Sequence, residues 1–396
     1  MPYIMTYRRK KAFQWLVDRF ADERILIVVG PRQVGKSTLM KQFQEERVAS
    51  GDSVFYITLE QFTYRELIDT NPDNVFQIIG NLDLNKKVTL IIDEIQYLKD
   101  PTHVLKYLFD TYKSNLKLIV TGSSAFYINE KFKDSLAGRK YIYEMQSLDF
   151  EEFLLFKNQT SPTAPPNLIE LEKLMPLFYE YVTYGGYPAV VLAPDIQAKK
   201  ELLHELADSY TKKDILDYHV ASQENYLRIL KLLSHQVGNL LNINVLANQL
   251  DIPRTTVERY IHVMEQSFHI ALIKPYFNNK KKEIKKMPKA FFYDMGLRNH
   301  FANNFDPFDL RIDKGMLLEN TAFRACLFAY ANEDIRFWRT SDSQEVDFII
   351  GDASAYEVKV NKTNVVMSKY NEFKKQYPHI PLSVIDAHDC VRLFLK

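Results

Sequence analysis

The chain is poor in glycine and cysteine and carries almost no net charge. Only 12 of its 396 residues are glycine, well below the usual share of about 7%, so each glycine within a motif is informative. The two cysteines, Cys326 and Cys390, are too few for a disulfide framework and lack the spacing of metal ligands. Lys and Arg number 51 against 50 Asp and Glu. This balance excludes a globally basic, nucleic-acid-binding coat, so any basic patch must be local.

Long hydrophobic runs are also missing. The longest unbroken aliphatic run, at residues 25–29, is far shorter than the roughly 20 residues that a membrane span needs. The N-terminus has no apolar segment of the kind that a secretory signal contains. We therefore expect a cytoplasmic protein with no membrane partner. The chain does contain 26 Phe, 24 Tyr and 2 Trp, which need buried cores, and its length suggests two or three domains.

Short apolar runs alternate with helical stretches over the first 150 residues. Continuous apolar runs of this kind are typical of parallel strands that are covered by helices on both faces. The fold class predicted for this part is therefore α/β with a parallel sheet. The runs lie at residues 25–29, 53–59, 88–92, 116–120 and 140–145.

The segment 30–37 reads GPRQVGKS and fits the phosphate-binding pattern G-x-x-x-x-G-K-[ST]. An apolar strand precedes it and a helical sequence follows, which is the context that this P-loop motif requires. The glycines let the backbone curl, so that its amides and the helix N-terminus point at the phosphates. We expect Lys36 to bridge the β- and γ-phosphates of ATP and the Ser37 hydroxyl to bind Mg²⁺. The predicted nucleotide-binding residues are Gly30, Gln33, Val34, Gly35, Lys36, Ser37 and Thr38.

A second motif, VTLIIDE at 88–94, ends a predicted strand with two acids. The carboxyl end of this strand would lie beside the phosphate loop, at the edge of the sheet where ligands of α/β folds bind. We expect Asp93 to hold Mg²⁺ and Glu94 to act as the general base that polarises the attacking water.

Two further polar residues could contact the phosphates. Ser123 follows the strand predicted at 116–120, where its hydroxyl could sense the γ-phosphate, although capping of the next helix explains it equally well. Arg139, in the sequence LAGRK, could reach phosphate charge in its own subunit or in a neighbour's, and the alternative is a plain surface arginine. Action on a neighbour would require a homo-oligomer.

The sequence TKKD at 211–214 resembles the guanine-specifying pattern [NT]-K-x-D. It follows a helical stretch rather than a strand and is distant in sequence from the phosphate loop, so we attribute it to chance. The Asp93–Glu94 pair also favours ATP over GTP.

A helix-turn-helix pattern lies at 243–264, with Val257, Ile261 and Met264 on one apolar face. A predicted hairpin follows, and residues 274–289 contain seven lysines and one glutamate, a net +6 in a chain of net +1. Such a local charge suits phosphate, although a winged helix can also serve as a lid or a subunit contact. The predicted DNA-binding residues are Arg254, Thr255, Thr256, Arg259, Lys280, Lys281 and Lys282.

Four residues near the C-terminus match the E…D…E-x-K pattern of the restriction-endonuclease-like fold. Glu319 lies on a predicted helix and Asp347 in a strand, and Glu357 and Lys359 share one face of the next strand. We expect Asp347 and Glu357 to share a divalent cation, with Glu319 adding charge and Lys359 stabilising charge at a phosphate. Without metal, repulsion should raise the pKa of at least one carboxylate. The alternative is a fold that keeps these residues and does not cleave.

The segments GPRQVGKST, LIIDEIQYL, LIVTGSS, LAGR and YGGYP at 184–188 occur in this order. In this respect the chain resembles bacterial and archaeal predicted ATPases of the AAA+/ASCE class whose C-terminal part is the domain of unknown function 4143. The resemblance covers nearly the whole chain. It implies an ATPase core, a winged-helix segment and a restriction-endonuclease-like C-terminal domain, and it implies no known substrate.

These patterns predict an ATP-hydrolysing, Mg²⁺-dependent protein that acts on DNA, single-stranded or branched, with C-terminal nuclease activity as an open hypothesis. One alternative is an ATP-dependent DNA-binding switch that does not cut. Another is a signalling ATPase that recognises protein partners. The predicted domains are a P-loop ATPase domain at 1–157, a helical and winged-helix region at 168–300, and a small α/β nuclease-like domain at 310–396, with a proline-rich linker at 158–167.

Overall fold

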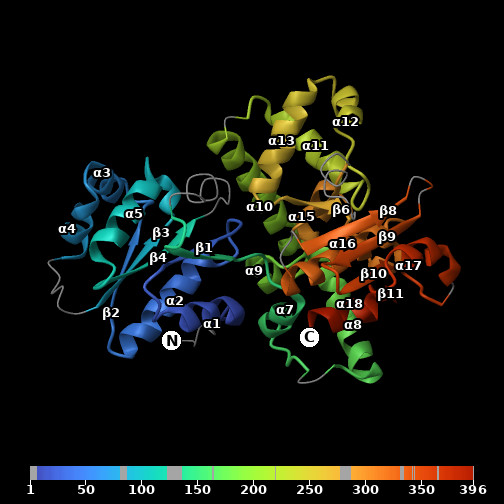
Figure 1. The fold of residues 1–396 in the computed structure, drawn as a ribbon, viewed down its shortest axis with the longest axis horizontal. Helices are drawn as coiled ribbons and strands as arrows, with labels where there is room; N and C mark the ends of the chain where they lie inside the picture. Colours follow the sequence, from blue (N-terminus) through green and yellow to red (C-terminus); the bar gives the residue numbers. More distant parts are fainter. Residues whose placement is uncertain are drawn as a thin grey trace. The chain divides into compact units, whose positions relative to one another are not determined.

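The structure is a computed structural model that divides into two compact units, Met1–Gln146 and Ser147–Lys396 (Figure 1). None of the helices in the described part of the chain is long and apolar enough to cross a membrane. The residues that the structure describes are 7–80, 87–122, 136–162, 165–218, 220–276, 287–330, 334–340, 342, 344–363 and 365–395.

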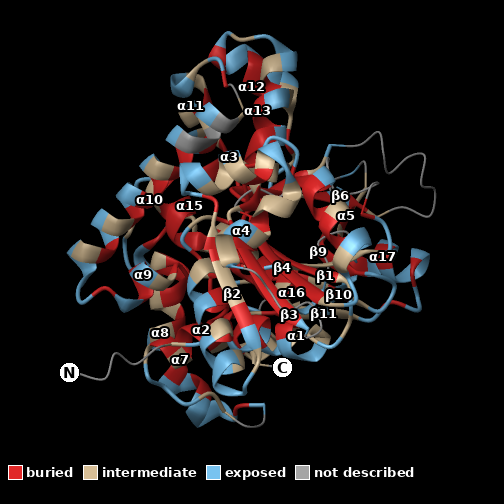
Figure 2. Cartoon of the chain, turned by 90° about the vertical axis from the view of Figure 1, so that its left-hand side faces the viewer, coloured by how far each residue is buried: buried red, intermediate tan, exposed pale blue. Residues whose placement is uncertain are grey.

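The first unit contains the predicted parallel sheet. Its strands are β1 (Ile25–Val29), β2 (Ser53–Thr58), β3 (Val88–Asp93), β4 (Leu116–Gly122) and β5 (Lys140–Glu144). Their order is β2-β3-β4-β1-β5, and all pairings are parallel. The central strands are buried along their whole length, whereas β2 and β5 at the edges are partly exposed (Figure 2). The α/β fold class is confirmed.

Helices cover both faces of this sheet, with α1 and α2 on one face and α3, α4 and α5 on the other (Figure 1). Successive strand residues point to opposite faces, so Ile25, Ile27 and Val29 share a core with Leu105 and Leu108 of α5. The helices are α1 (Lys10–Arg19), α2 (Lys36–Ala49), α3 (Phe62–Thr70), α4 (Val75–Ile79) and α5 (Pro101–Tyr112), with 3₁₀ turns at Pro72–Asn74 and Ile95–Tyr97.

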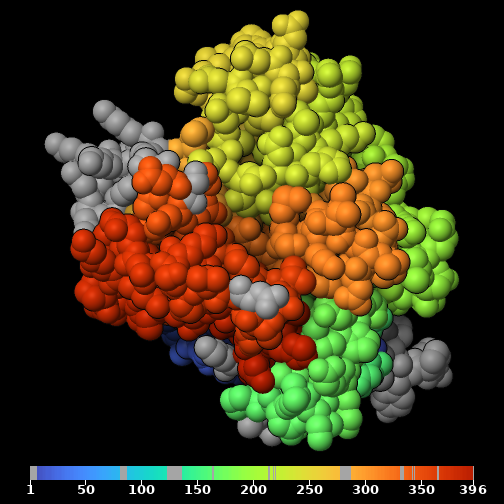
Figure 3. Space-filling view, turned by 90° about the vertical axis from the view of Figure 1, so that its right-hand side faces the viewer, coloured from blue at the N-terminus to red at the C-terminus, as the bar shows by residue number. Residues whose placement is uncertain are grey.

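The second unit begins with helices, and one pair of them forms the predicted helix-turn-helix. Asp251 ends the first helix of this pair in the left-handed conformation, with φ of 53°. In Figure 3 the yellow segment that contains the pair lies at the top, above the orange and red segments of the same unit. The helices are α7 (Phe150–Phe156), α8 (Leu168–Tyr184), α9 (Pro188–Leu192), α10 (Ile196–Asp217), α11 (Gln223–Ser234), α12 (Ile243–Leu250), α13 (Arg254–Gln266) and α15 (Met295–Phe301).

A six-stranded mixed sheet completes the second unit, in the order β11-β10-β9-β8-β6-β7. Strand β6 pairs antiparallel with β7 and parallel with β8, so the hairpin after α13 belongs to the same sheet as the C-terminal strands. The strands are β6 (Ile270–Pro275), β7 (Lys289–Phe292), β8 (Ile335–Arg339), β9 (Glu345–Ile350), β10 (Ser354–Val358) and β11 (Leu382–Ile385). The remaining helices are α16 (Lys314–Ala329), α17 (Asn371–Gln376) and α18 (Ala387–Phe394), with 3₁₀ turns at Phe308–Leu310 and Met367–Tyr370. The division into three domains stays a prediction.

Candidate functional site

The P-loop follows β1 directly and ends where α2 begins. Gly30 has φ of 152°, and a Cβ placed there would lie 1.9 Å from the carbonyl oxygen of Met145. The Met145 amide also donates a hydrogen bond of 2.7 Å to Val29, so the chain after β5 is held tightly against the loop. Gly35 has φ of 99° and caps α2. The close approach of Met145 at the first position and the positive φ at the second therefore both favour glycine.

The Lys36 ammonium lies inside its own loop. Its Nζ donates hydrogen bonds to the carbonyl oxygens of Gly30 at 2.9 Å and Pro31 at 2.7 Å, and the side chain is buried. Burial lowers the pKa of Lys36 to about 8, although the charges of Glu94 and Asp93 oppose this shift. The lysine must therefore exchange two carbonyl partners for phosphate oxygens when it binds a nucleotide.

The other predicted nucleotide-binding residues lie on the same loop and the start of α2. Val34 is buried, Gln33 and Thr38 are exposed, and Ser37 is half-buried. Arg9, which the sequence motifs did not indicate, donates hydrogen bonds of 2.8 Å to the carbonyl oxygens of both Val34 and Gln146. Arg9 thus ties the loop to the segment after β5.

Asp93 and Glu94 come to the same edge of the sheet as the P-loop. The buried Asp93 carboxylate accepts hydrogen bonds from the Thr121 hydroxyl and, at 2.6 Å, from the Tyr56 hydroxyl. Glu94 has φ of 60°, and its amide donates to the Thr121 hydroxyl oxygen at 3.1 Å. Because β4 lies between β1 and β3, its terminal Thr121 can hold both acids in place beside the P-loop.

Tyr56 connects the two halves of the predicted Mg²⁺ site. Burial, and then its hydrogen bond to Asp93, raises the pKa of the Tyr56 phenol, while an interaction with the Ser37 hydroxyl lowers it. Ser37 and Asp93 are thus neighbours of the same phenol. A carboxylate and a hydroxyl brought together beside the P-loop fit a hard cation such as Mg²⁺. Neither Tyr56 nor Thr121 was singled out, because the pairing of β2, β3 and β4 places them here.

The structure does not bring Arg139 to the P-loop of its own subunit. Its carbonyl oxygen accepts a hydrogen bond from Ile25 at the start of β1, whereas the P-loop follows the end of this five-residue strand, about 16 Å away at roughly 3.3 Å per residue. The guanidinium pairs with Asp110, with an Nε to Oδ1 distance of 2.8 Å. A role in the same subunit has no geometric support, and action on a neighbour stays a prediction. Ser123 lies outside the described residues.

Helix α13 presents the predicted polar face. Val257, Ile261 and Met264 are buried, as their spacing indicated. Of the residues on this helix that were predicted to contact DNA, Arg254, Thr255 and Arg259 are exposed and Thr256 is half-buried. Arg254 pairs with Glu258, Nε to Oε1 2.8 Å, and Arg259 donates to the Tyr218 carbonyl, while Lys280, Lys281 and Lys282 lie outside the described residues.

The predicted nuclease-like residues do come together in the second unit. Antiparallel pairing of β9 with β10 places Asp347 beside Glu357, and the Asp347 carboxylate accepts a hydrogen bond of 2.8 Å from the Val358 amide. Lys359 pairs with the buried Glu357. Glu319, on α16, is close enough that it and Glu357 raise the pKa of Asp347, in addition to the larger effect of burial.

A second lysine, Lys289, lies among these carboxylates. Its Nζ is 3.1 Å from Glu319 and 3.8 Å from Asp347, and it forms an ion pair with Glu345. Only 1% of the Lys289 side chain is exposed. Burial disfavours its charge, but Glu319, Asp347 and Glu345 outweigh burial and raise the pKa of Lys289. Lys289 is one of the seven lysines at 274–289, and its position removes it from the basic surface expected there.

The carboxylate cluster is a poor fit for a divalent cation. Among the described residues, no three His, Cys, Asp or Glu side chains are arranged to hold a metal ion, and two ammonium groups already pair with the acids. The buried second oxygen of Glu357 and the Tyr370 hydroxyl lack well-formed hydrogen bonds to described residues. These two groups nevertheless interact: the pKa of Tyr370 is raised by burial and then by the nearby charge of Glu357.

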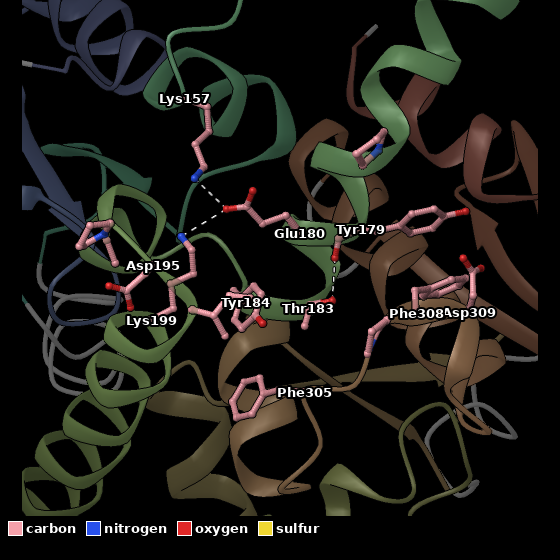
Figure 4. A pocket seen from close by; sticks show the side chains of 15 residues that line it. Lys157, Tyr179, Glu180, Thr183, Tyr184, Asp195, Lys199, Phe305, Phe308 and Asp309 are labelled. Atoms are coloured by element: carbon pink, nitrogen blue, oxygen red, sulfur yellow. Dashed lines mark hydrogen bonds and ion pairs between the residues drawn. The ribbon is translucent and has the colours of Figure 1, made fainter.

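The second unit also contains a cavity of about 470 Å³ that no sequence motif indicated (Figure 4). On one wall the Glu180 carboxylate pairs with Lys157 at 2.8 Å and with Lys199 at 3.2 Å. Two stacked aromatic pairs also line the cavity, namely Tyr184 with Phe305 and Tyr179 with Phe308, whose ring centroids are 5.8 and 4.7 Å apart. The lining comes from distant segments, so its residues could not be grouped from the sequence.

Three family models match the chain in succession. Residues 22–154 match an AAA domain, residues 175–307 match the domain of unknown function 8612, and residues 314–390 match the domain of unknown function 4143. An uncharacterized protein of Haemophilus influenzae is 27% identical over 93% of this chain and 92% of its own length. An uncharacterized protein of Methanocaldococcus jannaschii is 26% identical over 83% of this chain and 72% of its own length.

Solved structures with partial likeness include replication initiators. One is domain III of DnaA from Thermotoga maritima, with a TM-score of 0.31 and 16% identity over 50% of this chain and 91% of that one. Another is DnaA bound to AMPPCP and single-stranded DNA, with a TM-score of 0.31 and 16% identity over 64% of this chain and 86% of that one. At such TM-scores the likeness says nothing about function. The sequence matches, in contrast, agree with the motifs and the sheet: the chain combines an AAA domain with a C-terminal domain of unknown function 4143, and it is similar to uncharacterized bacterial and archaeal proteins.

Proposed function

We propose that this protein binds ATP with Mg²⁺ in its first unit and hydrolyses it. The observation that carries the proposal is the meeting of the P-loop lysine with Asp93 and Glu94 at one edge of the sheet, where both acids act on the charge of Lys36. Ser37 and Asp93 would hold Mg²⁺, which when bound neutralises phosphate charge.

Each residue at this edge has a separate task. The Lys36 ammonium leaves its loop carbonyls and pairs with the β- and γ-phosphate oxygens. Glu94 accepts the proton of the attacking water, and the Thr121 hydroxyl fixes the backbone of Glu94 in its left-handed conformation. Tyr56 orients the Asp93 carboxylate through its hydroxyl.

Two substitutions separate binding from hydrolysis. Lys36→Ala should abolish or greatly weaken ATP binding, because it removes the charge on the phosphates. Glu94→Gln should bind ATP at near-parental affinity and hydrolyse it very slowly, because it keeps the shape and loses the base. Calorimetric binding and phosphate-release assays measure the two effects. Hydrolysis by Glu94→Gln at the parental rate would disprove the base assignment.

We also propose that the protein acts on DNA through α13, as the recognition helix of a winged-helix segment that the hairpin β6–β7 completes. The burial of the apolar face of α13 supports this, because it leaves Arg254, Thr255 and Arg259 exposed. A protein-recognising ATPase would use the same face for a partner instead. Fluorescence anisotropy with single-stranded, duplex and branched DNA separates the two proposals. Thr255→Glu should weaken DNA binding, whereas Glu224→Gln on α11 is the matched surface control.

For the C-terminal domain we propose that it takes part in the action on DNA without cleaving it. The pairing of Glu357 with Lys359 and of Glu319 with Lys289 supports it, since a nuclease needs its carboxylates for a metal ion. Incubation of labelled DNA of each structure with Mg²⁺ or Mn²⁺, with and without ATP, tests the point. Cleavage that Asp347→Asn abolishes would establish the nuclease instead.

A further inference from the structure

We propose that the Lys289 ammonium is the built-in counter-ion of the C-terminal carboxylate cluster, and that it fills the position where a divalent cation would otherwise bind. The proposal deepens the non-cleaving function proposed for the C-terminal domain and rests on it. It also gives Lys289 a structural role, because this lysine begins β7 and its carboxylate partners belong to α16 and β9.

The Lys289 ammonium lies in a buried position among carboxylates. A lysine with 1% exposure is costly to bury unless its charge is compensated. Here Glu319, Glu345 and Asp347 surround it from two different elements, and the Phe337 ring lies 5.4 Å from its Nζ. Carboxylates from separate elements thus converge on one ammonium group, which takes the place among them that a hard cation would need.

The charges of the cluster nearly balance without a metal ion. Its four carboxylates face three cations, so at most a single negative charge remains uncompensated when all four are ionised. A divalent cation would overcompensate that charge in a buried place, next to an ammonium that repels it. The carboxylates are Glu319, Glu345, Asp347 and Glu357, and the cations paired with them are Lys289, Lys359 and Arg339.

The Glu319 carboxylate lies close to the backbone of Gly238. A Cβ placed on Gly238 would lie 2.7 Å from one Glu319 carboxylate oxygen and 2.8 Å from the other. The Gly238 amide also bonds to the carbonyl oxygen of Ala290, next to Lys289. The Glu319 carboxylate is therefore confined between the Gly238 backbone and the lysine, and it has little room to turn toward a metal ion.

The test is Mn²⁺ binding to the nucleotide-free full chain, followed by electron paramagnetic resonance and by thermal unfolding. We expect the parental protein and Asp347→Asn to bind the same number of Mn²⁺ ions, because no ion uses the cluster. A Mn²⁺ site in the parental protein that Asp347→Asn removes would overturn the proposal. This comparison does not depend on how the lysine variants fold.

Removal of the ammonium supplies the second comparison. Lys289→Met should bind Mn²⁺ at the carboxylate cluster at least about tenfold more tightly than the parental protein does, because the repelling charge is gone. Mn²⁺ should then raise the melting temperature of Lys289→Met but not that of Lys289→Met with Asp347→Asn. Lys274→Met, an exposed lysine of the same hairpin, is the matched control and should gain no site. Equal Mn²⁺ affinity in Lys289→Met and Lys274→Met would refute the counter-ion role.

Discussion

Nucleotide binding should weaken as the pH rises through about 8, because the P-loop lysine must be charged to pair with phosphate. In the nucleotide-free protein the pKa of Lys36 is lowered to about 8, mainly by burial. Phosphate oxygens favour the charged form, so the pKa rises on binding and the complex takes up a proton. If only charged Lys36 binds, the apparent dissociation constant increases about tenfold between pH 7 and pH 9, or about 1.4 kcal/mol.

Isothermal titration calorimetry in buffers of different ionisation enthalpy measures this proton directly. With a pKa of about 8 for Lys36, uptake should be near zero at pH 7, about half a proton at pH 8 and nearly one proton at pH 9. Lys36→Arg keeps its charge over this range and should take up no proton, whatever its affinity. Binding by the parental protein that is independent of pH, with no proton uptake at pH 9, would show that the lysine is charged before it meets phosphate.

Three further predictions concern Thr121, Gly30 and Arg139. Thr121→Val should lower the free energy of unfolding by about 2–5 kcal/mol in a urea titration, because it removes one of the hydrogen bonds of the buried Asp93 carboxylate and the hydroxyl acceptor of the Glu94 amide. Ser53→Ala, at the exposed start of β2, is the control, and an equal loss there would contradict the assignment. Gly30→Ala should impair both folding and ATP binding, since its Cβ would lie 1.9 Å from a backbone oxygen, and unchanged ATP affinity would exclude this crowding. If Arg139 acts on a neighbour's nucleotide, Arg139→Ala should lose on the order of 10³-fold in turnover, and mixing it with Lys36→Ala should restore some activity. No recovery in a mixture that assembles would argue against action between subunits.

The sequence was sufficient to predict the features that depend on short-range residue patterns. The P-loop, the acids that end β3 and the two faces of α13 depend on residues close together in the chain, so spacing identified them. Residues that act through long-range pairing were missed. Thr121 and Tyr56 meet Asp93 only because β2, β3 and β4 are neighbours in the sheet, and Arg9 reaches the P-loop from the position just before the first helix.

Lys289 and Arg139 show what local patterns leave out. Lys289 is one of the seven lysines whose charge suggested a phosphate-binding surface, although the apolar residues 290–292 that follow it indicate that it begins a buried strand. For Arg139 the sequence left open a contact with phosphate in its own subunit, a contact in a neighbour and a plain surface position, and its place before β5 argues against the first of these. In a parallel sheet a residue before a strand lies at the edge opposite to the P-loop.

The sharing of one sheet by the hairpin and the C-terminal strands has a practical consequence for dissecting the protein. A fragment that ends between α15 and α16 would keep β6 but lose β8, and the backbone of Lys274 and Pro275 in β6, which pairs with Arg336 and Phe337 of β8, would face solvent. It would also leave Lys289 buried in apolar surroundings without its carboxylates. Open strand edges pair with other copies, so such fragments should aggregate, and single substitutions in the whole chain are the sounder way to separate the activities of its parts.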